Sequence, residues 1–265
     1  MEWTPLSLLL TGWFSMASFM VILYVVQRLR EDAGIVDVGW ATGLAALAVF
    51  YGVSADGYLP RRTTLLLLAG LWGLRLGGYL FLNRVRRGPE DGRYQMLRNQ
   101  WGDRAQTYFF FFFQIQALWA VMFSLPFLVV AYNPLMTWTI FDTLAIVVWI
   151  AAIAGESTAD AQLAAFRSQP ENRGKTCREG LWRYSRHPNY FFEFLHWWSY
   201  VLLGVGSPYW WVTLTGPATM LLFLYKITGI PYTEKQALAS RGEEYREYQR
   251  TTSPFIPWFP KEEKK

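Results

Sequence analysis

The stretch PLSLLLTGWFSMASFMVILYVVQ, which runs from Pro5 to Gln27, carries no charged side chain. An α-helix needs about 20 consecutive apolar residues to cross the hydrocarbon core of a bilayer. The stretch has this length, and neither a basic segment before it nor a small-residue cleavage site after it marks it as a secretory signal. We therefore expect it to form a retained transmembrane helix.

Further apolar blocks follow along the 265 residues, of which 52% are apolar and 18% aromatic. The mean hydropathy is only +0.12, because polar loops at Arg84–Gln106 and Arg167–His187 dilute it. Since the sequence lacks alternating strand patterns, and helices satisfy their own backbone hydrogen bonds in lipid, it predicts an all-α integral membrane protein. We expect one domain over residues 1–265, a seven-transmembrane helical bundle. Its predicted spans are Pro5–Gln27, Ile35–Val53, Thr63–Asn83, Tyr108–Ala131, Trp138–Leu163, Tyr190–Val205 and Tyr209–Ile227.

The basic residues are distributed unevenly between the two sides of this bundle. If the N-terminus is outside, only Arg61 and Arg62 among the 25 Lys and Arg residues lie in an outside loop, and Arg75 lies within a span. Cytoplasmic loops carry the excess of basic residues in membrane proteins. The sequence thus predicts an outside N-terminus and a cytoplasmic C-terminus. The same rule explains the net charge of +5 without a nucleic-acid partner.

The sequence excludes several classes of site. Cys177 is the single cysteine, so no internal disulfide and no cysteine-based metal site is expected. The two histidines are too few for a histidine-rich metal site, and we expect no metal. The sequence contains no GxGxxG, GxxxxGK[ST] or GxSxG motif, so any nucleotide would be held by the membrane bundle itself.

Ionisable residues occur inside the predicted spans, where they are costly and mark functional sites. Asp37 begins the second span, Arg75 lies within the third, and Glu156 and Asp160 lie near the inner end of the fifth. Glu156 and Asp160, four residues apart, share a helical face that Arg167 extends. These charges are either structural ion pairs, such as Arg75 with Asp37 or Glu156, or the lining of a polar cavity open to the cytoplasm. The cavity is favoured, because buried ion pairs contribute little to stability.

Basic and aromatic residues are interleaved in the stretch GLWRYSRHPNYFFEFLHWW, which runs from Gly180 to Trp198. Arginine can bind phosphate oxygens in a bidentate way, and arginine and aromatic faces stack on planar rings. Membrane topology explains most of the basic residues, but it does not explain the aromatic residues among them. The pattern therefore suggests a nucleotide site. The aromatic residues near the basic clusters are Tyr94, Trp182, Tyr184, Tyr190, Tyr245 and Tyr248.

Three segments resemble the C-terminal half of the steroid 5α-reductase family: ADAQLAAFR (Ala159–Arg167), the stretch from Gly180 to Trp198, and SPFIPWFP (Ser253–Pro260). With DVGW and PEDGRY nearer the N-terminus, the chain resembles the bacterial, DUF1295-like branch of that family. RHPNY alone is less specific, because sterol reductases and isoprenylcysteine carboxyl methyltransferases have similar stretches. The resemblance implies a seven-helix enzyme of the bacterial inner membrane that uses NADPH bound from the cytoplasmic side.

The resemblance also implies which residues contact NADPH. Asp160, Arg167, Asn189 and Glu193 occupy family positions at the nicotinamide nucleotide, and Trp197 matches a tryptophan on the cofactor side. Lys175 stands where animal enzymes have an arginine, and Glu156 stands where they have an asparagine. Arg75, Asn83, Arg84 and Arg86 match a segment near the cofactor phosphates. To these we add the aromatic and histidine residues Tyr184, His187, Tyr190 and Tyr248.

The substrate implied by the resemblance is an apolar enone, such as a Δ4-3-oxo steroid, that enters from the surrounding membrane lipids. Residues 1–131 would mainly form its cavity, with Asp37, Trp40 and Trp72 in contact, and residues 132–265 would mainly bind NADPH. Trp72 stands where animal enzymes have the tyrosine that polarises the ketone. The catalytic candidates are therefore Asp37, Tyr79 and Arg75. The sequence predicts no oligomeric state.

Two other functions fit parts of the pattern. A membrane methyltransferase that uses S-adenosylmethionine would share RHPNY and a C-terminal Glu–Tyr region, and a non-catalytic lipid-binding scaffold would share the apolar helices. NADPH carries several phosphate charges, whereas S-adenosylmethionine is net positive. The clustered arginines and the pair Asp160 and Arg167 therefore favour the reductase.

Overall fold

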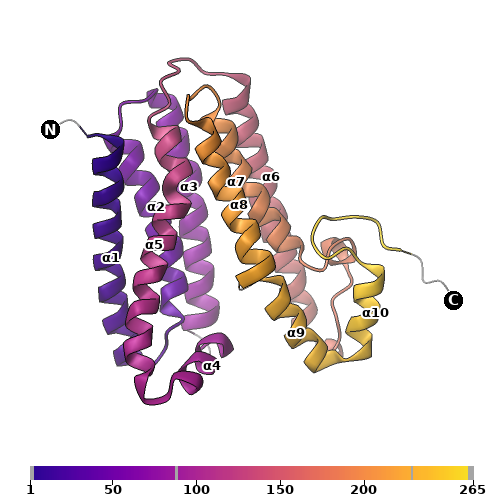
Figure 1. The fold of residues 1–265 in the computed structure, drawn as a ribbon. Coiled ribbons are helices and arrows are strands. Elements are labelled where there is room, and N and C mark those ends of the chain that lie inside the picture. The colour runs from indigo at the N-terminus through magenta and orange to yellow at the C-terminus, as the bar shows by residue number, and fades with distance from the viewer. Residues whose placement is uncertain (1–2, 87–88, 228, 262–265) are drawn as a thin grey trace. The chain divides into compact units, whose positions relative to one another are not determined.

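A computed structural model of the chain describes residues 3–86, 89–227 and 229–261, and these residues form helices and no strand (Figure 1). The chain divides into two units. The first consists of Met1–Asp142 and Leu203–Gly216, and the second consists of Thr143–Leu202 and Pro217–Lys265. Each unit thus consists of two segments, and the segments of the two units alternate along the sequence.

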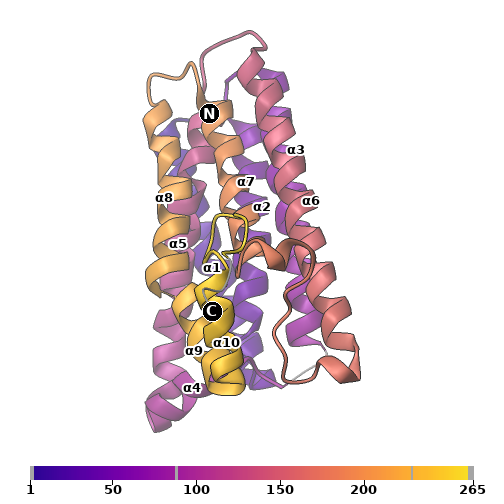
Figure 2. The same ribbon diagram turned by 90° about the vertical axis from the view of Figure 1, so that its right-hand side faces the viewer.

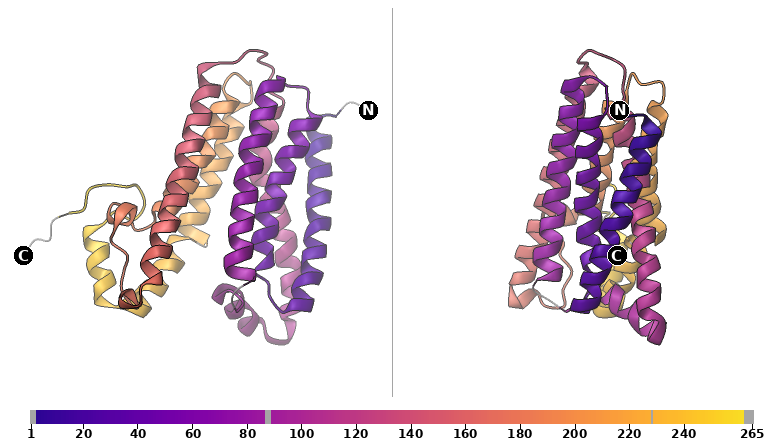
Figure 3. Two further views of the ribbon diagram at one scale, coloured as in Figure 1. Left: turned by 180° about the vertical axis from the view of Figure 1, so that it is seen from behind. Right: turned by 90° about the vertical axis from the view of Figure 1, so that its left-hand side faces the viewer.

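Four long helices of the first unit, α1, α2, α3 and α5, lie side by side (Figures 1 and 3). A π-helical turn, η1, ends α3, and the short helix α4 lies at one end of α5. The elements of this unit are α1 (Pro5–Arg30), α2 (Ile35–Ser54), α3 (Leu59–Leu80), η1 (Phe81–Val85), α4 (Gly92–Trp101), η2 (Gly102–Arg104), α5 (Ala105–Ala131) and η5 (Trp210–Leu214).

Helix α1 starts and stops where its sequence provides caps. Thr4 and Ser7 form a reciprocal capping box, and Pro5 occupies the first turn, where its missing N–H is not needed. At the other end Glu31 adopts the left-handed conformation with a φ of 55°. The apolar stretch that opens the sequence therefore lies in a helix that ends at Arg30, three residues beyond the predicted span.

Helices α2 and α3 pack closely because small residues line their contact. A Cβ atom at Gly73 would lie 2.6 Å from the carbonyl oxygen of Ala41, and one at Gly77 would lie 2.6 Å from the methyl group of Thr42. Small residues that let backbones approach are typical of helix pairs in membranes. Larger side chains at these two positions would force the helices apart.

A buried ion pair joins the start of α3 to the start of α6 (Ile140–Ser168) within the first unit. Arg61 Nε lies 2.6 Å from Asp142 Oδ1, and both side chains are 1% exposed. The guanidinium also donates to the carbonyl oxygens of Leu135 (2.7 Å) and Thr137 (2.8 Å). Arg61, one of the few basic residues predicted on the outside, is therefore neutralised by Asp142 and hydrogen-bonded through all three guanidinium nitrogens.

In the second unit the antiparallel helices α6 and α7 contact each other, with Gly155 of α6 against the ring of Phe192 of α7 (Figure 2). Helices α9 and α10 form a turn beyond α8, and the C-terminal segment returns toward α7. The elements of this unit are α6 from Thr143, η3 (Pro170–Asn172), η4 (Gly180–Arg183), α7 (Pro188–Gly204) as far as Leu202, α8 (Thr215–Leu222) from Pro217, η6 (Phe223–Ile227), α9 (Ile230–Arg241) and α10 (Glu243–Thr251).

Within the described ranges, five helical segments are long and apolar enough to cross a membrane, which confirms a helical membrane protein. They lie at Pro5–Arg30, Ile35–Ser54, Leu59–Asn83, Gly92–Ala131 and Ile140–Ser168. The sixth and seventh predicted spans are also helical but less regular. Helix α7 has 17 residues, and the last span is divided into 3-10, α and π segments.

Three helices lie outside the predicted spans: α4 in the polar loop Arg84–Gln106, and α9 and α10 after the last span. Asp91 caps the N-terminus of α4, and its side chain accepts a hydrogen bond from the N–H of Arg93. Helix α10 buries Tyr245 and Tyr248 on one face and leaves Arg246 on the other, exposed face. A search for membrane spans misses such helices because they are short and polar.

Candidate functional site

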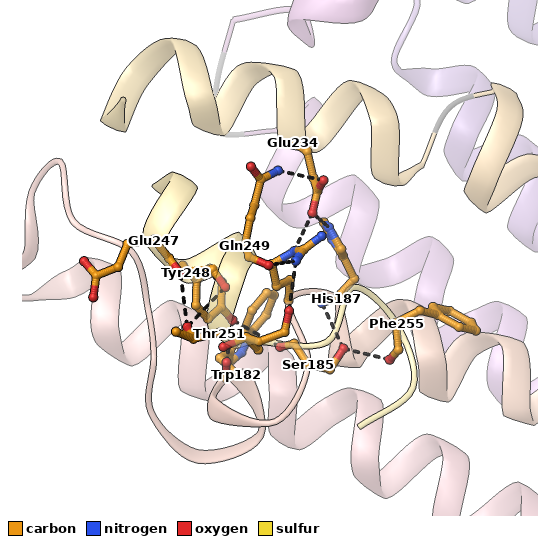
Figure 4. Close-up of polar contacts among 11 residues, drawn as sticks. Trp182, Ser185, His187, Glu234, Glu247, Tyr248, Gln249, Thr251 and Phe255 are labelled. Atoms are coloured by element: carbon orange, nitrogen blue, oxygen red, sulfur yellow. Dashed lines mark hydrogen bonds and ion pairs between the residues drawn. The ribbon is translucent and has the colours of Figure 1, made fainter. Parts of the chain in front are cut away.

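Arg186, within the basic and aromatic stretch, is the centre of a buried polar network that also contains His187, Glu234 and Gln249 (Figure 4). We call it the Arg186 network. Arg186 Nε donates to Glu234 Oε1 (2.6 Å), and Arg186 Nη1 donates to the carbonyl oxygens of Gln249 (2.8 Å) and Thr252 (2.9 Å). The Arg186 side chain is 9% exposed. This arginine therefore holds α9 and α10 to the start of α7.

The carboxylate of Glu234 is kept ionised by this network. Burial alone would raise its pKa, but hydrogen bonds from His187 and Arg186 lower the pKa of Glu234 to about 2. Gln249 Nε2 also donates to Glu234 Oε2 (2.9 Å). Glu234 is thus a fixed negative charge and not a proton donor at neutral pH.

The stability of the second unit should consequently depend on pH through Glu234. A carboxyl whose folded pKa is depressed adds stability above its unfolded pKa of about 4.5 and loses this contribution as the pH falls toward 2. We expect Glu234→Gln to lower the free energy of unfolding at pH 7 by up to about 3 kcal/mol. The difference from the unsubstituted protein should shrink between pH 4.5 and 3, as measured by chemical unfolding in detergent. A difference that stays constant with pH would contradict this assignment.

Tyr248 and Ser185 extend the same scaffold (Figure 4). The Tyr248 hydroxyl donates to the carbonyl oxygens of Trp182 and Ser185, and Ser185 Oγ donates to the carbonyl oxygen of Phe255 (2.7 Å). Burial raises the pKa of Tyr248 well above its usual value. The phenol is therefore a permanently protonated structural donor that ties α10 to the chain before α7.

The predicted cofactor residues Tyr184, His187 and Tyr190 also have protein partners. The ring of His187 stacks on Tyr190 at 5.3 Å, and the Tyr190 hydroxyl lies 3.3 Å from Thr233 Oγ1. The carbonyl oxygen of Tyr184 accepts the N–H of Trp258 (2.9 Å). A direct contact of these three residues or of Tyr248 with a cofactor stays a prediction.

The loop that follows the C-terminal end of α6 carries several basic side chains and is held by its own hydrogen bonds. Asn172 Nδ2 donates to the carbonyl oxygen of Phe166 (3.0 Å) and to Gln169 Oε1 (2.8 Å). The N–H of Lys175 donates to the carbonyl oxygen of Asn172 (3.0 Å). Between them Gly174 has a φ of 80°, which residues with a Cβ rarely adopt. These bonds define the path of the loop.

The turn between α9 and α10 lies opposite this loop. Gly242, with a φ of 58°, follows Arg241 and starts α10. The segment after Lys175 is fastened to α10, because the N–H of Thr176 donates to Glu244 Oε1 (3.0 Å). Arg178 Nη1 likewise lies 3.0 Å from Glu247 Oε1. These contacts hold the α6 loop against the α9–α10 turn.

A basic pocket of about 460 Å³ lies between the α6 loop and the α9–α10 turn. Its described lining residues carry four cationic side chains and no carboxylate, so it attracts anions. The predicted cofactor residues Arg167 and Lys175 meet here. The sequence did not single out Arg173 or Arg241, since they looked like ordinary cytoplasmic charges. The polar lining residues are Arg167, Ser168, Gln169, Asn172, Arg173, Lys175, Ser240 and Arg241.

Asp160 and Asn189, two further predicted cofactor residues, are brought together from α6 and α7. Asn189 Nδ2 donates to Asp160 Oδ1 at 3.2 Å. Trp182 Nε1 donates to the carbonyl oxygen of Ala159 (2.9 Å), which fixes η4 beside the same turn of α6. At a rise of 1.5 Å per residue, Asp160 lies about 10 Å along the helix from Arg167, which lines the basic pocket.

The predicted cofactor residues Glu156, Glu193 and Trp197 are largely buried. Glu156 is 6% exposed, Trp197 is 0% exposed, and the Glu193 side chain is 13% exposed. His196 Nδ1 lies 3.9 Å from Glu193 Oε1, and His196 Nε2 lies 2.8 Å from the Tyr200 hydroxyl. A histidine and a tyrosine therefore accompany Glu193 along α7.

In the first unit Asp37 has two close polar partners that the sequence did not assign to it. Arg93 Nη2 lies 2.7 Å from Asp37 Oδ2, and the Tyr94 hydroxyl donates to Asp37 Oδ1 (2.7 Å). Arg93 is also paired with Asp91 (3.0 Å). Tyr94 is 3% exposed. Asp37 thus accepts charge-assisted and phenolic hydrogen bonds, and α4 is fixed to the start of α2.

The remaining predicted residues of the first unit lie on α2, α3 and η1. Trp72 is fully buried, with its ring 6.4 Å from that of Trp40 in an edge-on arrangement. Tyr79 is 44% exposed, and its carbonyl oxygen accepts Asn83 Nδ2 (2.9 Å). Arg75 is half-buried on α3 and Arg86 is exposed after η1, whereas the Arg84 side chain lies outside the described residues. The predicted site residues therefore belong to both units.

A family model described as a protein of unknown function (DUF1295) matches residues 23–252 of the chain. No curated protein and no protein of solved structure matches the chain significantly. The matched range includes the Asp37 cluster, the basic pocket, the Asp160–Asn189 pair and the Arg186 network.

Proposed function

The chain belongs to the DUF1295 family, and we propose that it is an NADPH-dependent membrane reductase that acts on the C=C bond of an apolar enone. The family is related to the steroid 5α-reductases. The observation that carries the proposal is the basic pocket, which gathers Arg167, Arg173, Lys175 and Arg241 around a space of about 460 Å³.

The basic pocket suits the phosphates of NADPH. Guanidinium and ammonium groups make charge-assisted hydrogen bonds to phosphate oxygens. Among the described residues that line the pocket, Ser168, Asn172 and Ser240 add neutral donors, and none carries a negative charge. S-adenosylmethionine is net positive, so the same lining disfavours a methyltransferase. A scaffold that only binds lipid would not need this concentration of cations.

The pair of Asp160 and Asn189 suits the other end of the nucleotide. The pair lies about 10 Å along α6 from Arg167, and it offers an amide and a carboxylate for polar groups of the cofactor. Glu193 lies one helical turn after Asn189 on α7. We assign the phosphates to the basic pocket and the nicotinamide to the neighbourhood of Asn189, Glu193 and Trp197.

NADPH, when bound, supplies the hydride, and the protein supplies orientation and electrostatic stabilisation. The groups proposed for the substrate lie in the first unit. Arg75 and the cluster of Asp37, Arg93 and Tyr94 can stabilise or protonate the oxygen of a developing enolate. Tyr79 is the second candidate donor. The half-buried Trp40 would provide apolar surface for a substrate of the 3-oxo-Δ4-steroid type that enters from the bilayer, and the fully buried Trp72 packs edge-on against it.

The proposed topology has seven spans, an outside N-terminus and a cytoplasmic C-terminus. Helix α7 and the segment from η5 to η6 would provide the sixth and seventh spans. The basic pocket would then face the cytoplasm, since its four cationic residues belong to cytoplasmic segments under the positive-inside rule. The ion pair of Arg61 with Asp142 supports this orientation, because it removes the charge of an arginine on the outside.

The first test is the melting temperature of the detergent-purified protein with NADPH, NADH or S-adenosylmethionine. A ligand that binds only the folded state stabilises it by about 2.7 kcal/mol at 100 times its Kd. We expect a clear rise with NADPH and a smaller rise with NADH, which lacks one phosphate. A rise with S-adenosylmethionine alone would refute the reductase and favour the methyltransferase. A response to none of the three would favour the scaffold, provided that no nucleotide is released from the denatured protein.

A further inference from the structure

The C-terminal loop, Ser253–Lys261, presents large apolar side chains at the surface of the second unit. Ile256 is 61% exposed, Trp258 is 70% exposed and Phe259 is 74% exposed. Scattered exposed apolar residues are common, but three within four positions form a patch that marks an interaction surface.

This exposure does not result from fraying of the chain end. Prolines at every third position, Pro254, Pro257 and Pro260, restrict the backbone. Four hydrogen bonds hold the loop against the preceding chain. They join Arg186 N–H to the Ser253 oxygen (2.9 Å), Ser185 Oγ to the Phe255 oxygen (2.7 Å), Trp258 N–H to the Tyr184 oxygen (2.9 Å) and Lys261 N–H to the Thr251 oxygen (2.8 Å).

Phe255 determines the level at which the loop lies along α7. Its buried ring lies 5.8 Å from that of Phe191 and 5.6 Å from that of Phe194, both within the first two turns of α7. It also lies 5.5 Å from the ring of Tyr225 in η6. The loop is therefore fastened where the polar stretch before α7 gives way to the apolar helix.

We propose that the C-terminal loop inserts Ile256, Trp258 and Phe259 into the boundary between lipid headgroups and acyl chains. Tryptophan is enriched at this boundary, because its ring is apolar and its N–H is polar. Exposed Lys261 lies two residues after Phe259, and exposed Arg183 precedes Tyr184, whose ring lies 5.9 Å from that of Phe259. These cations suit the phosphates of anionic lipids. A bilayer is also the partner that a membrane protein always has where a polar stretch gives way to an apolar helix, as at the start of α7.

The proposal is tested by spin labelling of the full chain in nanodiscs that contain anionic lipid. Trp258→Cys places a nitroxide in the patch, and Arg246→Cys places the control label on α10, where the arginine is 65% exposed. The native Cys177 is buried, and the unsubstituted chain serves as the labelling blank. Collision rates with oxygen, which partitions into lipid, and with a polar nickel chelate are then measured at both sites.

We expect the label at position 258 to collide more often with oxygen than with the nickel chelate, and the label at 246 to show the reverse. A label at 258 that is open to the nickel chelate would show that the loop projects into water. Protection from both reagents, or a short distance between labels on two copies, would show that protein covers the patch. Either of these results would overturn the proposal, and neither depends on enzymatic activity.

Discussion

Replacing Asp142 by alanine is expected to lower the free energy of unfolding by about 3–5 kcal/mol. Arg61 and Asp142 are each 1% exposed, so the substitution leaves a guanidinium buried without its carboxylate. The two carbonyl oxygens that Arg61 also contacts cannot neutralise its charge. Unfolding by a denaturing detergent, followed by circular dichroism, measures the loss.

Two variants show whether the effect belongs to the buried charge. Glu243→Ala removes a carboxylate from exposed pairs with Arg246 and Arg250, and such pairs contribute less than about 1 kcal/mol. The double variant Arg61→Leu with Asp142→Leu removes both buried charges and should be more stable than Asp142→Ala. If Asp142→Ala and Glu243→Ala proved equally mild, the buried pair would not stabilise the first unit as described.

Reversing one charge in the basic pocket should weaken NADPH binding strongly. In the proposed complex, Lys175→Glu would remove a cation–phosphate contact and add a repulsive carboxylate. Charge-assisted hydrogen bonds contribute about 1.5–3 kcal/mol each, so we expect a loss of about 3 kcal/mol, or about a hundredfold in Kd. Isothermal titration calorimetry with the detergent-purified protein measures the affinity directly.

The matched control is Lys235→Glu, which makes the same change of net charge on the exposed surface of α9, outside the pocket lining. Its affinity for NADPH should stay close to that of the unsubstituted protein, apart from a weak, salt-sensitive effect. Equal affinities in the two variants would mean that the phosphates bind elsewhere. A thermal unfolding curve of Lys175→Glu without ligand checks that the variant is folded.

The sequence predicted the helices well because the membrane imposes a simple requirement on them. The uncharged run from Pro5 to Gln27 lies in α1, and the predicted span at Tyr108–Ala131 lies in α5. The sequence was less informative for the last predicted span, in which α8 lies between a 3-10 segment and a π segment. Such irregularities depend on local packing, which an average over about 20 residues does not detect.

Pairings between distant residues were the least predictable part of the candidate site. Arg75 was one possible ion-pair partner of Asp37, but nothing in the sequence singled out Arg93, 56 residues away, whose Nη2 lies 2.7 Å from Asp37 Oδ2. Arg186 pairs with Glu234, 48 residues away, and no pattern in the sequence singled out that glutamate. Asp160 and Asn189, which the family resemblance named as cofactor residues, lie 3.2 Å apart, and their contact with a cofactor stays a prediction.

The interruption of the first unit by the second affects the order in which the protein can be completed. Asn133 is fully buried, and its side chain donates to the carbonyl oxygens of Leu203 (3.2 Å) and Val205 (3.0 Å). A ribosome adds about 5–20 residues per second, so these acceptors emerge seconds after Asn133. The first four long helices are therefore synthesised seconds before the segment Leu203–Gly216 that completes their unit. A fragment that ended at Asp142 would lack this segment and the two acceptors of Asn133.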